Sequence, residues 1–133
     1  MAVVDASVII ATINPSDPHH EVSKRWLDDL ICSGNHFSAP TILLSEVSAP
    51  LSRAYNQPEL AQKIVQILME APFIRLFPVS ASLAYKAAVI AATYQIRGCD
   101  AIYVALAETL DEELITLDRQ QGERAKSIKV YSW

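Results

Sequence analysis

The chain has 133 residues, of which 51% are hydrophobic, and a chain of this size can form one core without disulfides or structural metals. Its formal net charge of −4 at pH 7 argues against a protein that holds nucleic acid mainly through lysine and arginine contacts to phosphates. No secretory signal pattern is present, and no apolar run approaches the roughly 20 residues of a membrane-spanning helix, so we expect one cytoplasmic domain over residues 1–133.

The first third of the chain alternates short apolar runs with a helical pattern. Residues 2–5 predict a strand that turns into a short helix around residues 8–11, and the proline-rich segment 14–18 ends that helix. An amphipathic helix is expected up to about Cys32, because large apolar residues recur there every three or four positions. Residues 36–39 then predict a brief second strand.

The middle of the chain predicts two helices and a strand. Residues 40–55 form a helix with Pro40 in its first turn, and Asn56 caps a second helix that runs to about residue 71. Residues 73–79 predict a strand. The residues expected to face inward in the two helices are Leu43, Leu44, Val47, Leu51, Leu60, Ile64, Ile67 and Leu68.

The last third of the chain predicts adjoining helices and the final strands. Ser80 or Ser82 caps a long alanine-rich helix, and Arg97 with Gly98 ends it. Strands separated by helical segments indicate an α/β sandwich with a mainly parallel sheet. The predicted segments are helices at residues 80–96, 99–110 and 118–126 and strands at residues 113–117 and 128–131.

Two aspartates stand directly after apolar strands. Asp5 and Asp118 each precede a helix, and in open α/β sheets ligands bind beyond the carboxyl ends of the strands. The two side chains would then lie at the same edge of the sheet. Each also fits a simpler role as the N-cap of the following helix, and the sequence leaves both roles open.

Two further acids become candidates for the same site as Asp5 and Asp118. Asp100 opens a helix, residues 100–107, that is apolar on almost every side and is therefore expected in the core. Its carboxylate would project out of the core toward a cleft, although helix capping explains it equally well. Glu46 by itself is typical of a solvated residue at the edge of a helix, and it becomes a candidate only in combination with the other three acids.

Together these segments resemble the PIN domain, in particular the VapC-type toxins of prokaryotic toxin–antitoxin pairs. The likeness covers nearly the whole chain and implies a three-layer, Rossmann-like α/β/α sandwich with a mainly parallel sheet. The segments that carry it are Asp5-Ala6-Ser7, Glu46 on a following helix, the run from Asp100 to Ala107, and Ile115-Thr116-Leu117-Asp118.

The resemblance also implies a site at one end of the sheet, where Mg²⁺ or Mn²⁺ binds and RNA is cleaved. Ser7 and Thr116 would orient carboxylates or metal-bound water. An additional acid often follows the last motif in VapC-type proteins, whereas Arg119 and two glutamines follow it here. The implied metal ligands are Asp5 and Asp100, completed directly or through water by Glu46 and Asp118.

Carboxylates suit this chemistry because hydrolysis of a phosphodiester needs an activated water and relief of charge on the phosphate oxygens. Two carboxylates about 4 Å apart repel by roughly 4 kcal/mol at an effective dielectric near 20, so a cluster of them calls for protons or cations. One or two bound cations would supply the positive charge that binding of RNA requires and that the net charge of the chain does not provide. Arg97 or Arg119 would meet the RNA backbone, and a solvated surface arginine is the simpler alternative.

The resemblance further implies a cognate antitoxin as a partner and a homodimer, for which the helix at residues 56–71 would supply an apolar face. Two other functions are weighed against the nuclease. A catalytically silent assembly module with the same fold is disfavoured by the full set of acids. A phosphoryl-transfer protein of the receiver or phosphatase type is disfavoured because Ala6-Ser7-Val8 follows Asp5 without a second acid and the late motif is Thr116-Leu117-Asp118, without the expected lysine.

The remaining reactive side chains indicate no second chemistry. Cys32 and Cys99 lack metal-binding spacing and are expected to be small buried groups. His19 and His20 are adjacent and would point in different directions on a helix, and His36 has no evident partner, so all three are expected to have ordinary surface roles. Glycine-rich nucleotide-binding motifs and the nucleophile elbow of hydrolases are absent from the sequence.

Overall fold

A sheet of five strands forms the centre of the molecule. The strands are β1 (Ala2–Val4), β2 (Phe37–Pro40), β3 (Ile74–Phe77), β4 (Glu113–Ile115) and β5 (Val130–Tyr131). The computed structural model describes residues 1–133, and its strands run in the order β3-β2-β1-β4-β5. Every neighbouring pair is parallel; Val3 of β1, for example, pairs with Ser38 on one side and with Leu114 on the other.

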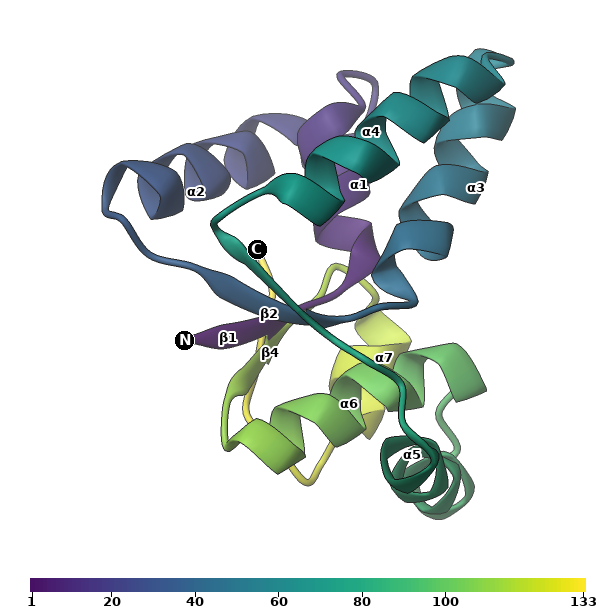
Figure 1. The fold of residues 1–133 in the computed structure, drawn as a ribbon. Helices are drawn as coiled ribbons and strands as arrows, with labels where there is room; N and C mark the ends of the chain where they lie inside the picture. The colour runs from purple at the N-terminus through teal and green to yellow at the C-terminus, as the bar shows by residue number, and fades with distance from the viewer.

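Helices cover both faces of this sheet (Figure 1). They are α1 (Ala6–Ile13), α2 (His20–Cys32), α3 (Leu43–Tyr55), α4 (Pro58–Glu70), α5 (Ala81–Tyr94), α6 (Gly98–Leu110) and α7 (Arg119–Arg124). The helices α1 to α4 lie on one face and α5 to α7 on the other, which confirms the predicted α/β/α sandwich. None of the helices is both long enough and apolar enough to cross a lipid bilayer.

The helix α6 is the central helix of the core, as its apolar sequence predicts. It packs against β1, β2 and β4, and its Tyr103, Val104 and Ala105 are fully buried. Val3 and Val4 of β1 are fully buried as well. Burying a valine or a larger apolar side chain contributes roughly 1.5 to 3 kcal/mol to the stability of the fold. This packing holds the start of α6 and the residues after β1 in place.

The direction of the strand order reverses at β1. The chain runs from β1 through β2 to β3 on one side and then returns to β4 on the other side of β1. Ligands of open α/β sheets bind at such a switch point, outside the carboxyl ends of the strands. The backbone N–H of Asp5 donates a hydrogen bond of 2.9 Å to the carbonyl of Ile115, so the ends of β1 and β4 are tied together where their acids follow.

The structure corrects two predicted boundaries. Pro40 ends β2 and does not begin the following helix, because a proline without an N–H is tolerated at the end of a strand. The next backbone N–H, of Thr41, continues the ladder by donating to Phe77. Asn56 does not cap α4; it adopts a left-handed φ of 50° and ends α3, a conformation that asparagine tolerates.

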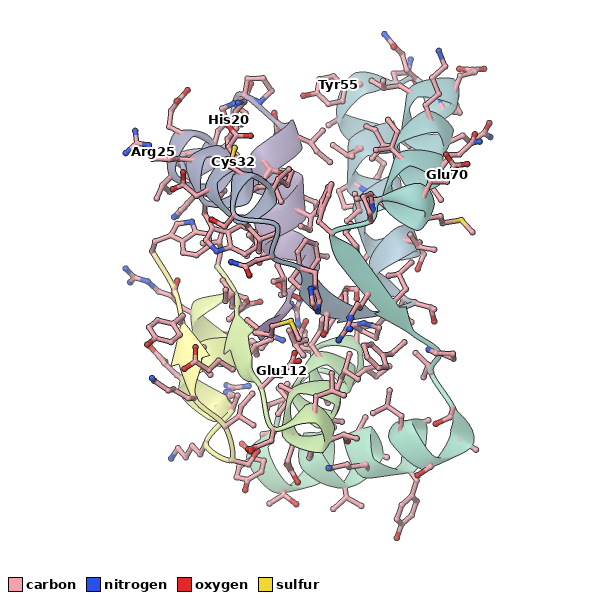
Figure 2. The ribbon with its side chains drawn as sticks, turned by 60° about the vertical axis from the view of Figure 1, so that its left-hand side comes forward. His20, Arg25, Cys32, Tyr55, Glu70 and Glu112 are labelled. Carbon is pink, nitrogen blue, oxygen red and sulfur yellow. The ribbon has the colours of Figure 1, made fainter.

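Several side chains predicted to be inward or buried are exposed instead. Ile67 of α4 is 63% exposed and Leu60 is 36% exposed, because α4 turns Ala61 and Leu68 toward the core. Cys32 and Cys99 are also exposed, which contradicts the expected burial. Both cysteines stand at helix ends, Cys32 at the last residue of α2 (Figure 2) and Cys99 in the first turn of α6, where fewer positions face the core.

Candidate active site

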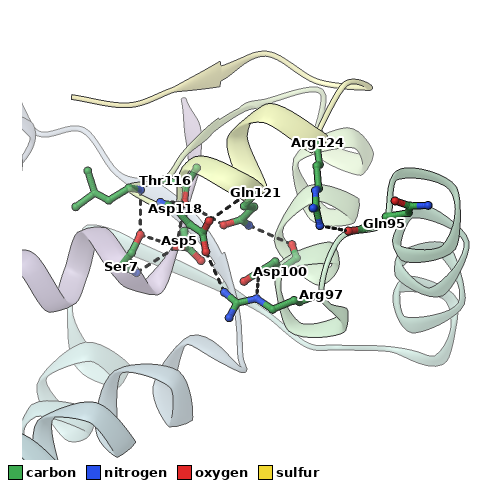
Figure 3. A network of polar contacts seen from close by, with 10 residues as sticks. Asp5, Ser7, Gln95, Arg97, Asp100, Thr116, Asp118, Gln121 and Arg124 are labelled. Carbon is green, nitrogen blue, oxygen red and sulfur yellow. Dashed lines mark hydrogen bonds and ion pairs between the residues drawn. The ribbon is translucent and has the colours of Figure 1, made fainter.

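The predicted acids lie around the switch point of the sheet. Asp5 follows β1, Asp100 is the third residue of α6 and Asp118 precedes α7, and Figure 3 shows these three side chains in one polar network. Glu46 comes from the first turn of α3 on the other face of the sheet, and its carboxylate is close enough to be repelled by Asp5 and Asp100. The fold thus brings acids from both ends and the middle of the chain to one place.

Asp5 is the most enclosed acid, with an exposed fraction of 5%. Its Oδ2 accepts hydrogen bonds from the Ser7 hydroxyl at 2.6 Å, the Ser7 N–H at 3.2 Å and the Thr116 hydroxyl at 3.2 Å. Burial raises the pKa of Asp5, the bonds from Ser7 oppose that increase, and the negative charge of Asp100 adds to it. Asp5 therefore caps α1, and it keeps Oδ1 free of these bonds for a ligand.

The two hydroxyls beside Asp5 link the strand ends. The Ser7 hydroxyl also accepts from the backbone N–H of Leu117 at 3.0 Å, and the Thr116 hydroxyl accepts from the N–H of Asp118 at 3.0 Å. Thr116 is 1% exposed. Both hydroxyls thus hold the Asp5 carboxylate, which follows β1, against the segment after β4, an arrangement that can orient it.

Gln121 was missed by the sequence reasoning. It is 2% exposed, its Oε1 accepts from the Thr116 hydroxyl at 2.9 Å, and its Nε2 donates to the carbonyl of Asp100 at 3.2 Å. The spacing from Asp118 to Gln121 is that of a helix capping box, and the N–H of Gln121 indeed donates to Asp118 Oδ1 at 3.1 Å. That signal was available, but the partners of the side chain come from α6 and β4 and are not local.

Glu46 is not the solvated residue that it would be in isolation. Its Oε1 is buried and has no hydrogen-bond partner, and the buried hydroxyl of Tyr103 has none either. Burial raises the pKa of Glu46, the adjacent Tyr103 hydroxyl opposes that increase, and the charges of Asp5 and Asp100 add to it. Burial and the Glu46 carboxylate likewise raise the pKa of Tyr103, which the sequence reasoning had treated only as core. A buried carboxylate oxygen without a donor is unfavourable until a proton or a cation reaches it.

Arg97 joins two of the acids. Its Nε donates to Asp100 Oδ2 at 2.8 Å and its Nη2 donates to Asp118 Oδ2 at 2.9 Å, although the arginine side chain is 74% exposed (Figure 3). The Asp100 carboxylate raises the pKa of Arg97. Arg97 occupies the N-cap position of α6 and no side chain caps that helix, so the capping role considered for Asp100 is wrong. Arg119 is exposed and pairs with no acid.

The donor set of this site fits a hard divalent cation. Carboxylate oxygens are the ligands that Mg²⁺ and Mn²⁺ prefer, and Glu46 Oε1 is a buried oxygen that lacks a donor. With Arg97 seated between Asp100 and Asp118, no three acidic side chains converge closely enough to hold one ion. The cation that the acids share in this arrangement is the guanidinium.

Comparisons with known proteins extend these observations. The PIN domain family matches residues 2–127. No curated protein matches the chain in sequence. Among solved structures, the VapBC2 complex of Rickettsia felis bound to a DNA fragment from its promoter has a TM-score of 0.75 at 15% identity and covers 99% of this chain and 98% of that chain.

Two further solved structures are similar over most of their length. VapC20 of Mycobacterium tuberculosis, a toxin that cleaves the sarcin–ricin loop, has a TM-score of 0.78 at 20% identity and covers 92% of this chain and 94% of its own. FitAcB of Neisseria gonorrhoeae has a TM-score of 0.71 at 20% identity and covers 98% of this chain and 96% of its own. At such identities the likeness shows a shared fold.

Proposed function

We propose that this chain, which belongs to the PIN domain family, is a divalent-metal-dependent endoribonuclease and the toxin of a toxin–antitoxin pair. One observation carries the nuclease proposal: acids from separate elements gather at the switch point of the sheet, and the pKa values of Asp5 and Glu46 are raised by burial and by the charge of neighbouring acids. Residues 1–133 act as one nuclease domain in this proposal. The proposed metal ligands are Asp5, Glu46, Asp100 and Asp118.

The side chains around the acids have defined tasks in this proposal. Bound Mg²⁺ or Mn²⁺ supplies positive charge against the phosphate oxygens and activates the attacking water. Ser7 and Thr116 hold the Asp5 carboxylate through its Oδ2 and leave Oδ1 for the cation. Gln121 ties the start of α6 to Thr116, so Asp100 and Asp5 keep a constant relative position. Preorganised ligands of this kind reduce the cost of assembling charge during the reaction.

The proposed substrate is RNA, and the charge of the site explains why a cation is required. The chain carries 15 acidic and 11 basic residues, and the site itself is acidic, so a phosphate backbone approaches it only when cations offset the carboxylates. Arg97 and Arg119 stand beside the acids and are the proposed contacts to the RNA backbone. Arg97 already binds carboxylate oxygens, which resemble phosphate oxygens in charge.

An antitoxin is the proposed protein partner, since VapBC toxin–antitoxin complexes are among the structures with the same fold. The proposed location is the cytoplasm, because both the proposed RNA substrate and the proposed antitoxin would be met there. We also propose a homodimer through α4, where Leu60 and Ile67, two turns apart on the same side of the helix, are 36% and 63% exposed.

Metal-dependent cleavage of RNA tests the proposal. Wild-type protein should cleave RNA with Mn²⁺ or Mg²⁺ and stop when EDTA is added, and Asp5→Asn and Asp100→Asn should each reduce the rate by about 100-fold or more. Circular dichroism of both variants controls for folding. Cleavage that persists in EDTA or in both variants rejects this site. A wild-type protein that binds a partner but cleaves no RNA under any metal favours the silent assembly module.

A further inference from the structure

The Arg97 guanidinium sits where the acid cluster needs a cation. It contacts Asp100 Oδ2 through Nε and Asp118 Oδ2 through Nη2. The other oxygen of Asp118, Oδ1, already accepts the capping N–H of Gln121. Arg97 therefore takes the Asp118 oxygen that is not engaged in the cap, together with an oxygen of Asp100. In this arrangement the acids do not form a set of three around one ion.

The position of Arg97 permits its release. The residue lies between α5 and α6, at the N-cap of α6, and its side chain is 74% exposed. Asp100 is buried, so its carboxylate stays in place when the arginine leaves, whereas the side chain of Asp118 is 29% exposed and can turn toward an ion. Ion pairs of such exposed arginines are weak because water competes for both partners, whereas a divalent cation brings twice the charge into direct contact with the oxygens.

Arg97 is also the one basic side chain that contacts the acids of the site. The other ion pairs of the chain join Lys24, Lys86 and Lys129 to acids elsewhere on the surface. A guanidinium presents several N–H donors in a plane, a geometry that suits two oxygens of a phosphate as well as it suits carboxylates. An arginine displaced from Asp100 and Asp118 remains at the rim of the site, within reach of an RNA backbone bound there.

We infer that Arg97 is a metal-responsive ligand for the RNA phosphate. In the metal-free protein it neutralises Asp100 and Asp118; when a divalent cation binds these acids the guanidinium is released, and it then contacts the RNA backbone. This inference rests on the proposed function, because it requires that the same acids bind the cation. Metal and RNA binding reinforce each other through this one side chain, and by linkage the effect is reciprocal.

Mn²⁺ binding in the absence of RNA tests the first half of the inference. Arg97→Gln should bind Mn²⁺ roughly five-fold more tightly than wild type, because a competing ion pair is removed. Arg97→Lys keeps the charge but has a single nitrogen in place of the two that span Asp100 and Asp118, so it should show a smaller gain. Arg119→Gln removes the same charge from the exposed neighbour of Asp118 and should bind Mn²⁺ like wild type. The electron paramagnetic resonance signal of free Mn²⁺ measures each affinity.

Two further measurements follow the arginine itself. In ¹⁵N-labelled protein the Arg97 Nε–H resonance, identified by its absence from Arg97→Lys, should shift when Mg²⁺ is added. The affinity for a fluorescent single-stranded RNA, measured by stopped-flow mixing before turnover, should increase with Mg²⁺ over EDTA in wild type. In Arg97→Gln that increase should be several-fold smaller, because the released guanidinium is missing.

The outcomes separate this inference from the proposed function. If wild type and Arg97→Gln bind Mn²⁺ equally while Asp100→Asn weakens binding, the inference is overturned and the metal site stands. If Asp5→Asn and Asp100→Asn leave Mn²⁺ binding unchanged, both are overturned. If Arg97→Gln binds Mn²⁺ more tightly but its RNA affinity responds to metal as in wild type, the RNA half of the inference is overturned. Because Arg97 is exposed, unchanged circular dichroism is expected for its variants.

Discussion

At the carboxyl end of the sheet, the buried side chains Asp5, Thr116 and Gln121 are polar and joined by hydrogen bonds. At the amino end of β2, the ring of Phe37 lies 5.9 Å from that of Trp26, and Trp133, from the segment after β5, packs on Trp26 with the ring centroids 5.5 Å apart. Burying polar groups stabilises a fold little, while burying aromatic rings stabilises it strongly. The carboxyl end of the sheet therefore holds the polar groups of the candidate site, while aromatic packing at the other end contributes to stability.

The size of a cavity does not distinguish the two ends. A cavity of about 500 Å³ lies beside Glu46, and one of about 420 Å³ lies at the amino end, lined by Trp26 and His36 among others. Both ends also hold a buried polar atom without a partner, which at the amino end is Nε2 of the partly buried His36. Only the carboxyl end adds mutually repelling acids, and it is this convergence of charge that marks the candidate site.

The largest difference between the two ends of the sheet is expected when a glutamate is replaced by glutamine at each of them. Glu46→Gln should reduce RNA cleavage by about 100-fold, because it removes a charge from the proposed metal ligands. Glu112 also has a buried oxygen without a partner, but it precedes β4 at the amino end (Figure 2). Glu112→Gln should therefore cleave like wild type. Equal rates for the two variants in single-turnover assays would remove the functional distinction between the ends.

The stabilising role of the amino end is tested by Trp133→Ala. Trp133 packs on Trp26 and its Nε1 donates to the Ser23 hydroxyl at 3.0 Å, so the C-terminus is held against α2. Its loss should lower the free energy of unfolding by about 2 kcal/mol, less than for a fully buried tryptophan because Trp133 is partly exposed. Urea unfolding measures the change. The rate of RNA cleavage per folded molecule should stay the same, and a selective loss of rate would contradict the division of roles.

Gln121→Leu tests both roles in one variant, because Gln121 contributes hydrogen bonds to stability and also connects the residues that position the acids. The change keeps the side-chain volume but removes the bonds to Thr116 and to the Asp100 carbonyl. We expect a loss of about 1 to 2 kcal/mol in the free energy of unfolding. RNA cleavage should also decrease at low Mn²⁺ and recover at high Mn²⁺, because the ligands are displaced and not removed. A variant that loses stability alone would show that Gln121 does not position the acids.

The smallest expected effect is the pH dependence of the metal-free protein. Burial raises the pKa values of Asp5 and Glu46 above their ordinary values of 3.8 and 4.5. Between the ordinary and the raised values the folded protein holds more protons than the unfolded chain, so its stability decreases as pH rises through that window. Asp5→Asn should lessen the decrease, by on the order of 1 kcal/mol for each unit of pKa change removed. Urea unfolding in EDTA between pH 4 and pH 8 measures it, and stability that rises with pH over this range would contradict the prediction.

Much of the fold follows from local features of the sequence. The strand before Asp5, the buried helix after Arg97 and the cap at Ser80 were all predicted, and the Ser80 hydroxyl does accept from the N–H of Leu83 at 3.1 Å. The α/β/α arrangement follows too, because strands that alternate with helices favour a parallel sheet covered on both faces. Asp5 and Asp118 could be named from the sequence for the same reason, since residues that follow parallel strands share an edge, whereas Glu46 and Asp100 were named through the resemblance to the PIN domain.

What the sequence by itself determined was therefore the order of the elements and the edge of the sheet at which Asp5 and Asp118 stand. Only the tertiary structure decided that Arg97 spans two acids, that Gln121 joins two elements, and which face of α4 is exposed. The physical reason is the range of the interactions. Periodicity and capping depend on residues a few positions apart, whereas the partners of these side chains lie on other elements and are set by how whole helices pack on the sheet.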